Sequence, residues 1–512
     1  MLLNNLTLEL EFLSNHEKRL IMISTDIHGN KYNRTLLMTV LITGSFVTIL
    51  TATLLATAYP SMMKTFNIDA STVQWLTTGF TLVNGIMIPV SAYLINKLST
   101  KLMYISALIV YLIGTILAYW SPNFQVLLAG RLIQAVGAGV SMPMMQSIIL
   151  MIYPPEKRGA AMGTMGLAIG MAPAIGPTLS GYIVDHFTWR DLFGMIIPII
   201  SIVIIAAFFL MKDVLPNTNP KLDFWSVVTS IAGFGIMLYG FAEVGSKGWG
   251  DTTVIASLII GAIIIAIFAI RQFKLDEPFL NLNVFKTGQY TLGTLISSLS
   301  YMGMLAAEMI LPLYIQNVLG KTALQSGLIL LPGAIAMGVM SPITGRLFDK
   351  YGAKQIVITG TILLIFGSSA FLFIGPNTPT IYITVFYAVR MFGIAMMMMT
   401  VTTAGMNALP LNLMTHGTAV NNTVRQVAGS IGTAILTSVL TNVASSNTPA
   451  KSLLSQNPLA YKDQAINAVI LGYKSAFIVA IIFAILILFA ALFLQKGNSA
   501  RSEEITNGKE AK

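Results

Sequence analysis

Membrane-length apolar segments recur along the whole chain, and they constrain its fold more than any other feature of the sequence. A run of about 20 apolar residues is long enough to cross a bilayer as a helix. The 512-residue chain is 55% hydrophobic and only 10% charged, whereas soluble globular proteins carry about 25% charged residues. We therefore expect an all-α polytopic membrane protein with 14 spans, at 36–59, 74–95, 102–120, 125–150, 159–183, 192–211, 224–242, 253–271, 288–316, 324–346, 354–375, 379–405, 415–441 and 471–494.

The fifth of these spans contains a stretch with five glycines and two prolines, GTMGLAIGMAPAIGPTLSGY at residues 163–182. In the interior of an exposed helix a glycine costs about 1 kcal/mol and a proline about 3 kcal/mol. In a bilayer, neighbouring helices can satisfy the freed backbone groups, and small residues let helices approach closely. The residues alone leave two interpretations open: a helix built for tight packing, or a hinge in a transporter.

The basic residues are distributed unevenly over the segments that join the spans. If the N-terminus is cytoplasmic, most of the 30 lysines and arginines lie in cytoplasmic segments, as the positive-inside rule requires. This predicts that both termini are cytoplasmic. It also relates the net charge of +10 to membrane topology and not to nucleic-acid binding. The longest outer segment, 442–470, is polar, and we expect a surface loop there.

Patterns typical of enzymes and metal sites are missing from the sequence. The chain has no cysteine, which excludes disulfides and thiol catalysis, and its four histidines lack metal-ligand spacing. No nucleotide-binding motif, nucleophile elbow or inserted soluble domain points to an enzyme or a membrane sensor. We therefore expect no catalytic residues, no metal and no enzymatic activity.

Three patterns recur at nearly constant offsets of 253, 259 and 254 residues. The repeated positions are Ala92 with Gly345, Arg131 with Arg390, and Gly163 with Gly417. Such a repeat predicts two pseudo-repeated six-helix bundles, with two additional helices inserted between them. The expected divisions are a cytoplasmic segment 1–35, a first half 36–212, an insertion 213–287, a second half 288–495 and a cytoplasmic tail 496–512. Residues 1–21 match no structural element, so the start codon could encode Met1 or Met22.

Together these patterns resemble the major facilitator superfamily, in its fourteen-span EmrB/QacA-type branch of drug:proton antiporters. The resemblance covers nearly all of the chain after residue 35. It implies a substrate site between the halves, alternating access by rocking, and export of small amphipathic molecules in exchange for protons. The alternative function is export of one physiological solute, such as a lipid, peptide or metabolite, by the same mechanism. We expect a monomer in a bacterial plasma membrane, with no cofactor besides the proton gradient.

The fifth span carries the family's antiporter motif, with Pro173, Gly176, Pro177, Ser180 and Gly181, the serine standing where a glycine is usual. The resemblance implies export over uptake. The glycines should let this span lie against its repeat counterpart, the thirteenth span, which begins near Gly417.

The loop after the tenth span matches the family's loop motif at Gly345, Asp349, Gly352 and Lys354. The glycines permit a tight turn, and Asp349 can cap the next helix and pair with a cation, which would latch one conformation. The first copy of the motif is degraded, because Ala92, Asn96 and Ser99 replace glycine, aspartate and glycine. Any latch should therefore be stronger in the second half.

Three arginines lie inside predicted spans, where each should face a cavity or a partner because the guanidinium remains charged. Arg131 and Gln134 match the family's proton-coupling motif, Arg390 is the repeat partner of Arg131, and Arg425 resembles a branch signature. We expect Arg131 to take part in proton coupling, with snorkelling to an interface as the structural alternative. Gln134, Arg390 and Arg425 are expected to line the substrate cavity or to gate it.

The first span of the family carries an acid where this chain has Thr51, so that position cannot bind protons here. Glu308 is the acid that lies deepest inside a predicted span, and a membrane-buried carboxyl group is a natural proton site. We expect proton coupling at Glu308, with a static ion pair or an interfacial position as alternatives. Within Met396–Met399, we expect Met397 to line the cavity, since methionine adapts to varied ligands, although lipid-facing packing also explains such a run.

Overall fold

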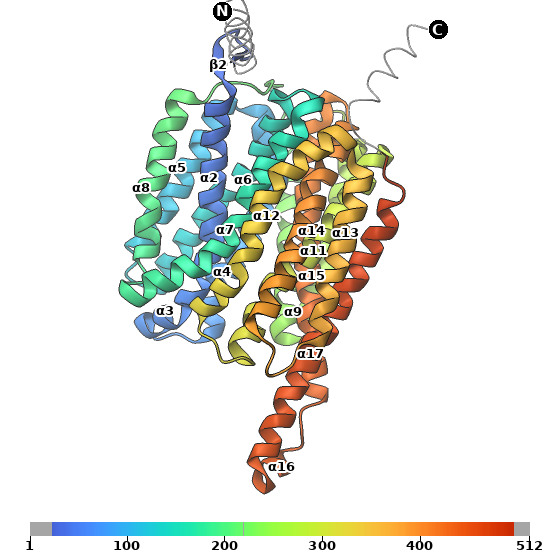
Figure 1. Cartoon of the computed structure of the whole chain (residues 1–512). Coiled ribbons are helices and arrows are strands. Elements are labelled where there is room, and N and C mark those ends of the chain that lie inside the picture. Colours follow the sequence, from blue (N-terminus) through green and yellow to red (C-terminus); the bar gives the residue numbers. More distant parts are fainter. Residues whose placement is uncertain (1–22, 219, 496–512) are drawn as a thin grey trace, which may run out of the picture.

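The computed structural model describes residues 23–218 and 220–495. Within these residues, 14 helices are long and apolar enough to cross a membrane. They stand side by side in one bundle, and α2 (Arg34–Leu54) begins on the same side of the bundle as α17 (Pro458–Ala491) ends (Figure 1). We call this the terminal side of the bundle and the opposite side the far side.

Side-chain caps mark where helices of the first half begin. Its elements are α2, η1 (Ala56–Ala58), α3 (Tyr59–Phe66), α4 (Ala70–Lys97), α5 (Thr100–Tyr119), α6 (Phe124–Ile152), η2 (Pro155–Lys157), α7 (Arg158–His186) and α8 (Asp191–Leu210). Asn33, Ser99 and Asn123 accept hydrogen bonds from backbone N–H groups in the first turns of α2, α5 and α6. These N–H groups have no partner inside their helix, so the caps fix the helix starts.

The inserted pair is α9 (Phe224–Lys247) and α10 (Thr252–Lys274). The second half contains η3 (Leu282–Lys286), α11 (Gly288–Asn317), α12 (Ala323–Tyr351), α13 (Ala353–Ala370), η4 (Phe371–Phe373), α14 (Thr380–Asn407), η5 (Leu411–Leu413), α15 (Met414–Ser446), α16 (Lys451–Gln456) and α17. Thr322 and Gln325 form a capping box that begins α12.

The same helix pairs pack together in both halves. In the first half α5 packs on α6, α2 on α7 and α5 on α8. Their repeat counterparts, α13 on α14, α11 on α15 and α13 on α17, pack in the same way. The predicted fold of two related six-helix bundles with two inserted helices is confirmed.

The two halves meet along α7 with α12 and along α15 with α4, and α14 also contacts α7 and α15 contacts α6. α7 and α12 lie side by side at the front of Figure 1. The expectation that the fifth span lies against the thirteenth was wrong. In the pseudo-symmetric arrangement the fifth helix of each half packs on the second helix of the other half. The glycines of α7 serve this contact, because Gly163 lies against the Ser341 carbonyl and Gly170 against Met337.

The inserted helices pack beside one of these pairs. α9 contacts α10, α4 and α15. At the terminal side Asp223, the N-cap of α9, accepts hydrogen bonds at 2.6 and 2.7 Å from the guanidinium of Arg271 on α10. The bidentate hydrogen bond from Arg271 lowers the pKa of Asp223 to about 2. The insertion is therefore fastened at the terminal side by an ion pair.

Two regions differ from the predicted pattern of spans and loops. β1 (Ile23–Thr25) and β2 (Lys31–Asn33) form an antiparallel hairpin directly before α2 in the chain. The segment expected to be a surface loop at 442–470 is largely helical, since α15 runs to Ser446 and α17 begins at Pro458. Asn457 caps the first turn of α17, and proline is favoured at that position, so the helix begins here. The first turns of α17 and the short helix α16 protrude from the far side (Figure 1). Met1, Met22 and the tail 496–512 lie outside the described residues.

Candidate functional site

Glu308 lies in the far half of α11 and is half-buried. Among the described residues its carboxylate has no hydrogen-bond partner and no salt bridge. Arg390 and Tyr387 of α14 are close enough to interact with it electrostatically. The acid therefore lies beside a positive charge without being held by it, which leaves its oxygens available to a proton or a ligand.

Arg390 is fully buried between three helices of the second half. Its Nε donates to the Ser368 hydroxyl at 3.2 Å, and its Nη2 donates to the Gly303 carbonyl of α11. Its Nη1 has no hydrogen-bond partner among the described residues. The guanidinium is thus fixed in place by two of its nitrogens while the third keeps a free donor.

Arg131 is held in the same manner inside the first half. It is fully buried, and its Nη1 donates to the Gln134 amide oxygen at 2.8 Å and to the Thr51 carbonyl at 3.5 Å. Its Nε donates to the Leu76 carbonyl at 3.3 Å, and its guanidinium lies 4.2 Å from the centre of the Phe80 ring. The arginine therefore binds backbone carbonyls where the resembled family has a first-span acid.

Gln134 is locked into this cluster, because its amide nitrogen donates to the Thr115 hydroxyl of α5 at 2.7 Å. Its hydrogen bonds lie within the first half, so it holds Arg131 and packs on α5. Glu308 and Arg131 were each expected to take part in proton coupling. The structure places Glu308 near Arg390, and the hydrogen bonds of Arg131 are made within the first half.

Arg425 lies where the two halves meet. Its Nη2 donates to the Asn422 amide oxygen at 2.6 Å and contacts the Met142 sulfur of α6 at 3.7 Å, while its guanidinium lies 5.2 Å from the Tyr301 ring centre. Asn422 in turn donates to the Gln146 amide oxygen of α6 at 2.7 Å, across the boundary between the halves.

Sequence reasoning missed Gln146. A single glutamine in an apolar helix gives no signal by itself, although it shares α6 with Arg131 and lies on the side of α6 that meets the second half. Its amide nitrogen, Arg425 Nη1 and the Asn421 amide nitrogen are buried without partners among the described residues. Unpaired buried donors of this kind suit a hydrated or ligand-binding region between the halves.

The methionine run contacts both its own half and the other one. Met397, expected in the cavity, packs on α13, where the Thr361 hydroxyl lies 3.0 Å from its sulfur. Met399 is the residue of the run that lies against Gly166 of α7. Met399, two positions along the helix from the predicted residue, therefore meets the first half.

The antiporter motif attaches α7 to two neighbours. Pro173 and Pro177 lie inside the helix. Gly176 packs against Thr53 of α2, where a Cβ atom would overlap the hydroxyl, and Gly181 faces Leu324 of α12. The motif thus packs α7 against α2 of its own half and against α12 of the other half.

Asp349 makes the clearest contact between the halves on the terminal side. Its two carboxylate oxygens accept hydrogen bonds from the backbone N–H groups of Gly159 and Ala160, at 2.8 and 2.9 Å. Asp349 therefore caps α7 of the other half, and not the next helix as predicted. Anions are stabilised at a helix N-terminus, where unpaired N–H groups and the helix dipole meet.

The other residues of that motif support this contact. A Cβ atom at Gly345 would overlap the Gly159 carbonyl oxygen, so glycine is needed for the approach of α12 to α7. Gly352 has φ of 81°, a conformation that favours glycine, and it ends α12. Lys354 donates to the Leu492 carbonyl at the end of α17 at 2.7 Å.

The degraded first copy of the motif forms a weaker counterpart. The Asn96 amide lies 3.4 Å from Nε2 of His416 near the start of α15, which is the repeat-related position. The backbone N–H of Asn281 donates to Nδ1 of the same ring at 3.3 Å. Asp213, after α8, takes over a capping role by accepting from the Lys101 backbone N–H at 2.9 Å.

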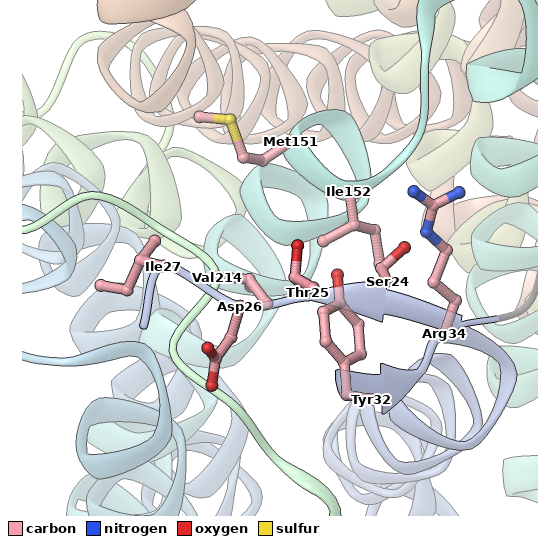
Figure 2. Close-up of a pocket in the computed structure, with 9 residues that line it drawn as sticks. All are labelled: Ser24, Thr25, Asp26, Ile27, Tyr32, Arg34, Met151, Ile152 and Val214. Atoms are coloured by element: carbon pink, nitrogen blue, oxygen red, sulfur yellow. The ribbon is translucent and has the colours of Figure 1, made fainter. Parts of the chain in front are cut away.

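Two cavities open on the terminal side, away from Glu308. The first, about 390 Å³, lies between the hairpin and the end of α6 and is lined by Ser24, Thr25, Asp26, Ile27, Tyr32, Arg34, Met151, Ile152 and Val214 (Figure 2). The second shares Arg34, Met151 and Ile152 with it. Among the described residues there is no group of three or more His, Cys, Asp or Glu side chains that would hold a metal ion.

The chain matches the family model of the Major Facilitator Superfamily over residues 41–433. It is 46% identical over 474 residues to the MFS-type transporter YcnB of Bacillus subtilis (strain 168), which covers 93% of this chain and 98% of that protein. It is 39% identical to the lincomycin resistance protein LmrB of the same organism, over 93% of this chain and 99% of LmrB.

The fold is also similar to that of a solved structure. The crystal structure of the human organic anion transporter MFSD10 (TETRAN) aligns with a TM-score of 0.60 and 13% identity, over 89% of this chain and 99% of that chain. The repeated helix packing, the 14 apolar helices and these similarities agree. The chain belongs to the major facilitator superfamily.

Proposed function

We propose that this protein is a secondary active exporter of amphipathic compounds, drugs among them, and that it moves its cargo out of a bacterial cell in exchange for protons. In this proposal the terminal side faces the cytoplasm, and the protein works as a monomer in the plasma membrane. Its similarity to a lincomycin resistance protein supports drug export.

The observation that carries the proposal is the environment of Glu308. A half-buried carboxylate without a hydrogen bond or salt bridge among the described residues can bind a proton from one side and release it to the other. Arg390 lies close enough to interact with this carboxylate, and a cationic or hydrogen-bonding cargo can compete with the proton for the same oxygens. Competition between proton and cargo at one group is the simplest basis for antiport.

The closed terminal side gives the conformational part of the mechanism. The halves are joined there by Asp349 with the start of α7, by Arg158 with Asn407 at 2.9 Å, and by Asn96 with His416. Cargo would enter from the cytoplasm only after these contacts separate. Rocking of the halves along the glycine-lined contact of α7 and α12 would then switch the side of the membrane to which the cargo site opens.

Export of one physiological solute remains the second candidate. Arg131, Arg390 and Arg425 are buried, and each keeps one nitrogen donor without a partner among the described residues. Against these three cations the candidate site has one acid, Glu308. Such an excess of buried donors favours neutral or acceptor-rich cargo over dications. A transport panel that contains cationic, neutral and anionic amphipaths separates the two candidates.

The test uses Glu308→Gln in inverted vesicles with an imposed pH gradient. We expect drug-dependent proton flux, with lincomycin and the panel as cargo, to fall at least about tenfold, because the amide cannot exchange a proton. Glu243→Gln is the matched control, since Glu243 pairs with Lys247 at 3.0 Å near the far end of α9. Flux that is unchanged in Glu308→Gln, or equally reduced in both variants, would show that Glu308 is not the coupling site.

A further inference from the structure

The second cavity on the terminal side is formed by both halves of the protein. It has a volume of about 600 Å³, within the range of small-molecule sites. The first half contributes the start of α2, the end of α6 and the start of α7, and the second half contributes the end of α14 and the start of α15. Its lining residues are Arg34, Met151, Ile152, Tyr153, Pro154, Pro155, Arg158, Asn407, Leu409, Pro410, Leu411 and Met414.

Hydrogen-bond donors in this lining are buried and incompletely used. Arg158 is only 4% exposed, and it is held in place by donating to the Tyr153 carbonyl at 3.1 Å and to the Asn407 amide oxygen at 2.9 Å. The amide nitrogen of Asn407 is buried without a partner among the described residues. The same is true of Arg34 Nε, whose guanidinium lies 5.8 Å from the Tyr153 ring centre. Arg34, Met151 and Ile152 line both cavities, and Figure 2 shows them at the first cavity.

The charged residues that line the cavity are basic. Two arginines line it, and none of the described lining residues is acidic. Glu156, in η2, interacts with Arg158 but does not line the cavity, and Asp349 is engaged by the start of α7. Asp26, in the neighbouring cavity, already accepts hydrogen bonds from His28 and Asn30. The remaining surface is apolar, with Met151, Leu409 and Met414 among its residues.

We infer that this cavity binds an amphipathic anion, with a phosphate head group between Arg34, Arg158 and Asn407 and an alkyl chain along the apolar residues. Arginine and amide donors suit a phosphate, and buried charge-assisted hydrogen bonds are the strongest of their kind. The occupant touches both halves, so it stabilises the conformation in which the terminal side is closed. This site goes beyond the proposed export function, because binding requires neither a proton gradient nor Glu308.

The test measures binding to the full-length protein in phosphatidylcholine nanodiscs, with hexyl phosphate as the probe and empty nanodiscs as the blank. We expect hexyl phosphate to raise the Tm of the protein, and hexyltrimethylammonium to leave it unchanged. Arg34→Gln should weaken hexyl phosphate binding about tenfold, the effect expected for one charge-assisted hydrogen bond. Lys31→Gln is the matched control, since this exposed cation of the hairpin lines neither cavity.

A second variant keeps the inference testable if Arg34→Gln folds poorly. Asn407→Asp preserves an oxygen for Arg158 and adds a negative charge to the lining, so it should abolish the Tm shift. Equal shifts with the phosphate and the ammonium probe, or full binding to Asn407→Asp, would overturn the inference.

The source of the natural phosphate is decided in the same assay. If 20% phosphatidylglycerol in the nanodisc competes with hexyl phosphate, the site takes a membrane lipid head group. If it does not compete, the site takes a soluble amphipath. Binding that survives in Glu308→Gln separates this inference from the proposed transport mechanism.

Discussion

Two of the contacts between the halves, α7 with α12 and α15 with α4, are related by the internal repeat but differ in chemistry. The α7–α12 contact brings two backbones together, with Gly159 against Gly345, Gly163 against the Ser341 carbonyl, and Gly338 against Met171. At its terminal end a charged side chain, Asp349, accepts two hydrogen bonds. In this contact the two helix backbones touch at glycines, so little side-chain volume separates them.

The α15–α4 contact is less close, and side chains rather than backbone atoms meet in it. Gly85 of α4 packs against Gln426 of α15 and against Leu238 of α9, so the inserted pair covers this side. Its terminal end is a single 3.4 Å contact between Asn96 and His416. Both contacts keep the geometry of the repeat, and we expect the α7–α12 contact to act as the pivot while the α15–α4 contact separates more easily.

The ring of His416 also shows why the second contact is weak. Asn281 donates its N–H to Nδ1, so in the neutral ring Nε2 carries the proton. The Asn96 side chain must then present its oxygen to Nε2, with the amide turned by about 180°, an assignment that the hydrogen-bond network decides. A neutral amide facing a neutral imidazole contributes less than a carboxylate facing two helix N–H groups.

The largest effect is expected from Gly345→Ala, which tests whether the α7–α12 contact is a pivot. The added Cβ would overlap the carbonyl oxygen of Gly159, and backbone atoms cannot move aside as a flexible side chain does. We expect loss of more than about 90% of efflux, with lowered thermal stability, since overpacking costs about 1–3 kcal/mol. Efflux per molecule of protein in the membrane is the measurement.

Gly181→Ala is its control on the same pair of helices. Its Cβ would lie 3.7 Å from Leu324, an ordinary van der Waals distance, so efflux should stay near wild type. If Gly345→Ala also transports normally, the close approach at the terminal side does not matter for function, and the comparison between the two contacts loses its basis.

An intermediate effect is expected from Asp349→Asn, which tests the two terminal-side contacts against each other. Hydrogen bonds to a charged group contribute about 1.5–3 kcal/mol, and a neutral one about 0.5–1.5 kcal/mol. Asp349→Asn should therefore lower efflux about tenfold, and Asn96→Ala only about twofold to threefold. Labels on the terminal ends of α7 and α12, read by distance measurements, should show a larger open population in Asp349→Asn. The opposite order of the two effects would mean that the α15–α4 contact is the stronger latch.

The sequence was sufficient for the fold because membrane spans are set by local hydropathy and repeats by spacing. The same local signals located Asp349 and Glu308 as unusual acids. They could not assign partners. Asp349 caps α7 in place of the next helix, and Glu308 lies near Arg390, because both arrangements depend on how helices cross in three dimensions.

Two further misses have the same physical origin. Four consecutive methionines look alike in sequence, so Met397 and Met399 could not be distinguished until the neighbours of α14 were known. Gln146 gave no periodic or motif signal, yet it joins the halves through Asn422. The helical structure within 442–470 was missed because its polarity is typical of loops, whereas Asn457 and Pro458 begin α17 there.

The smallest effect is expected from Asp223→Asn, which tests whether the inserted helices support the α15–α4 contact. Arg271 lowers the pKa of Asp223 to about 2 from 3.8, so the pair stabilises the fold above the unfolded-state value and this contribution is lost as the pH falls toward 2. At pH 7 we expect the variant to melt about 1–2 °C lower, as for an ion pair near the protein surface, and this difference should shrink to about half by pH 3. A difference in Tm that does not change between pH 7 and pH 3 would show that the stabilisation comes from packing of α9 and not from the ion pair.

Double variants test the coupling between the insertion and the two contacts. Asp223→Asn combined with Asn96→Ala should lower the Tm by more than the sum of the two single effects, since α9 packs on both α4 and α15. Combined with Asp349→Asn, the two decreases in Tm should simply add.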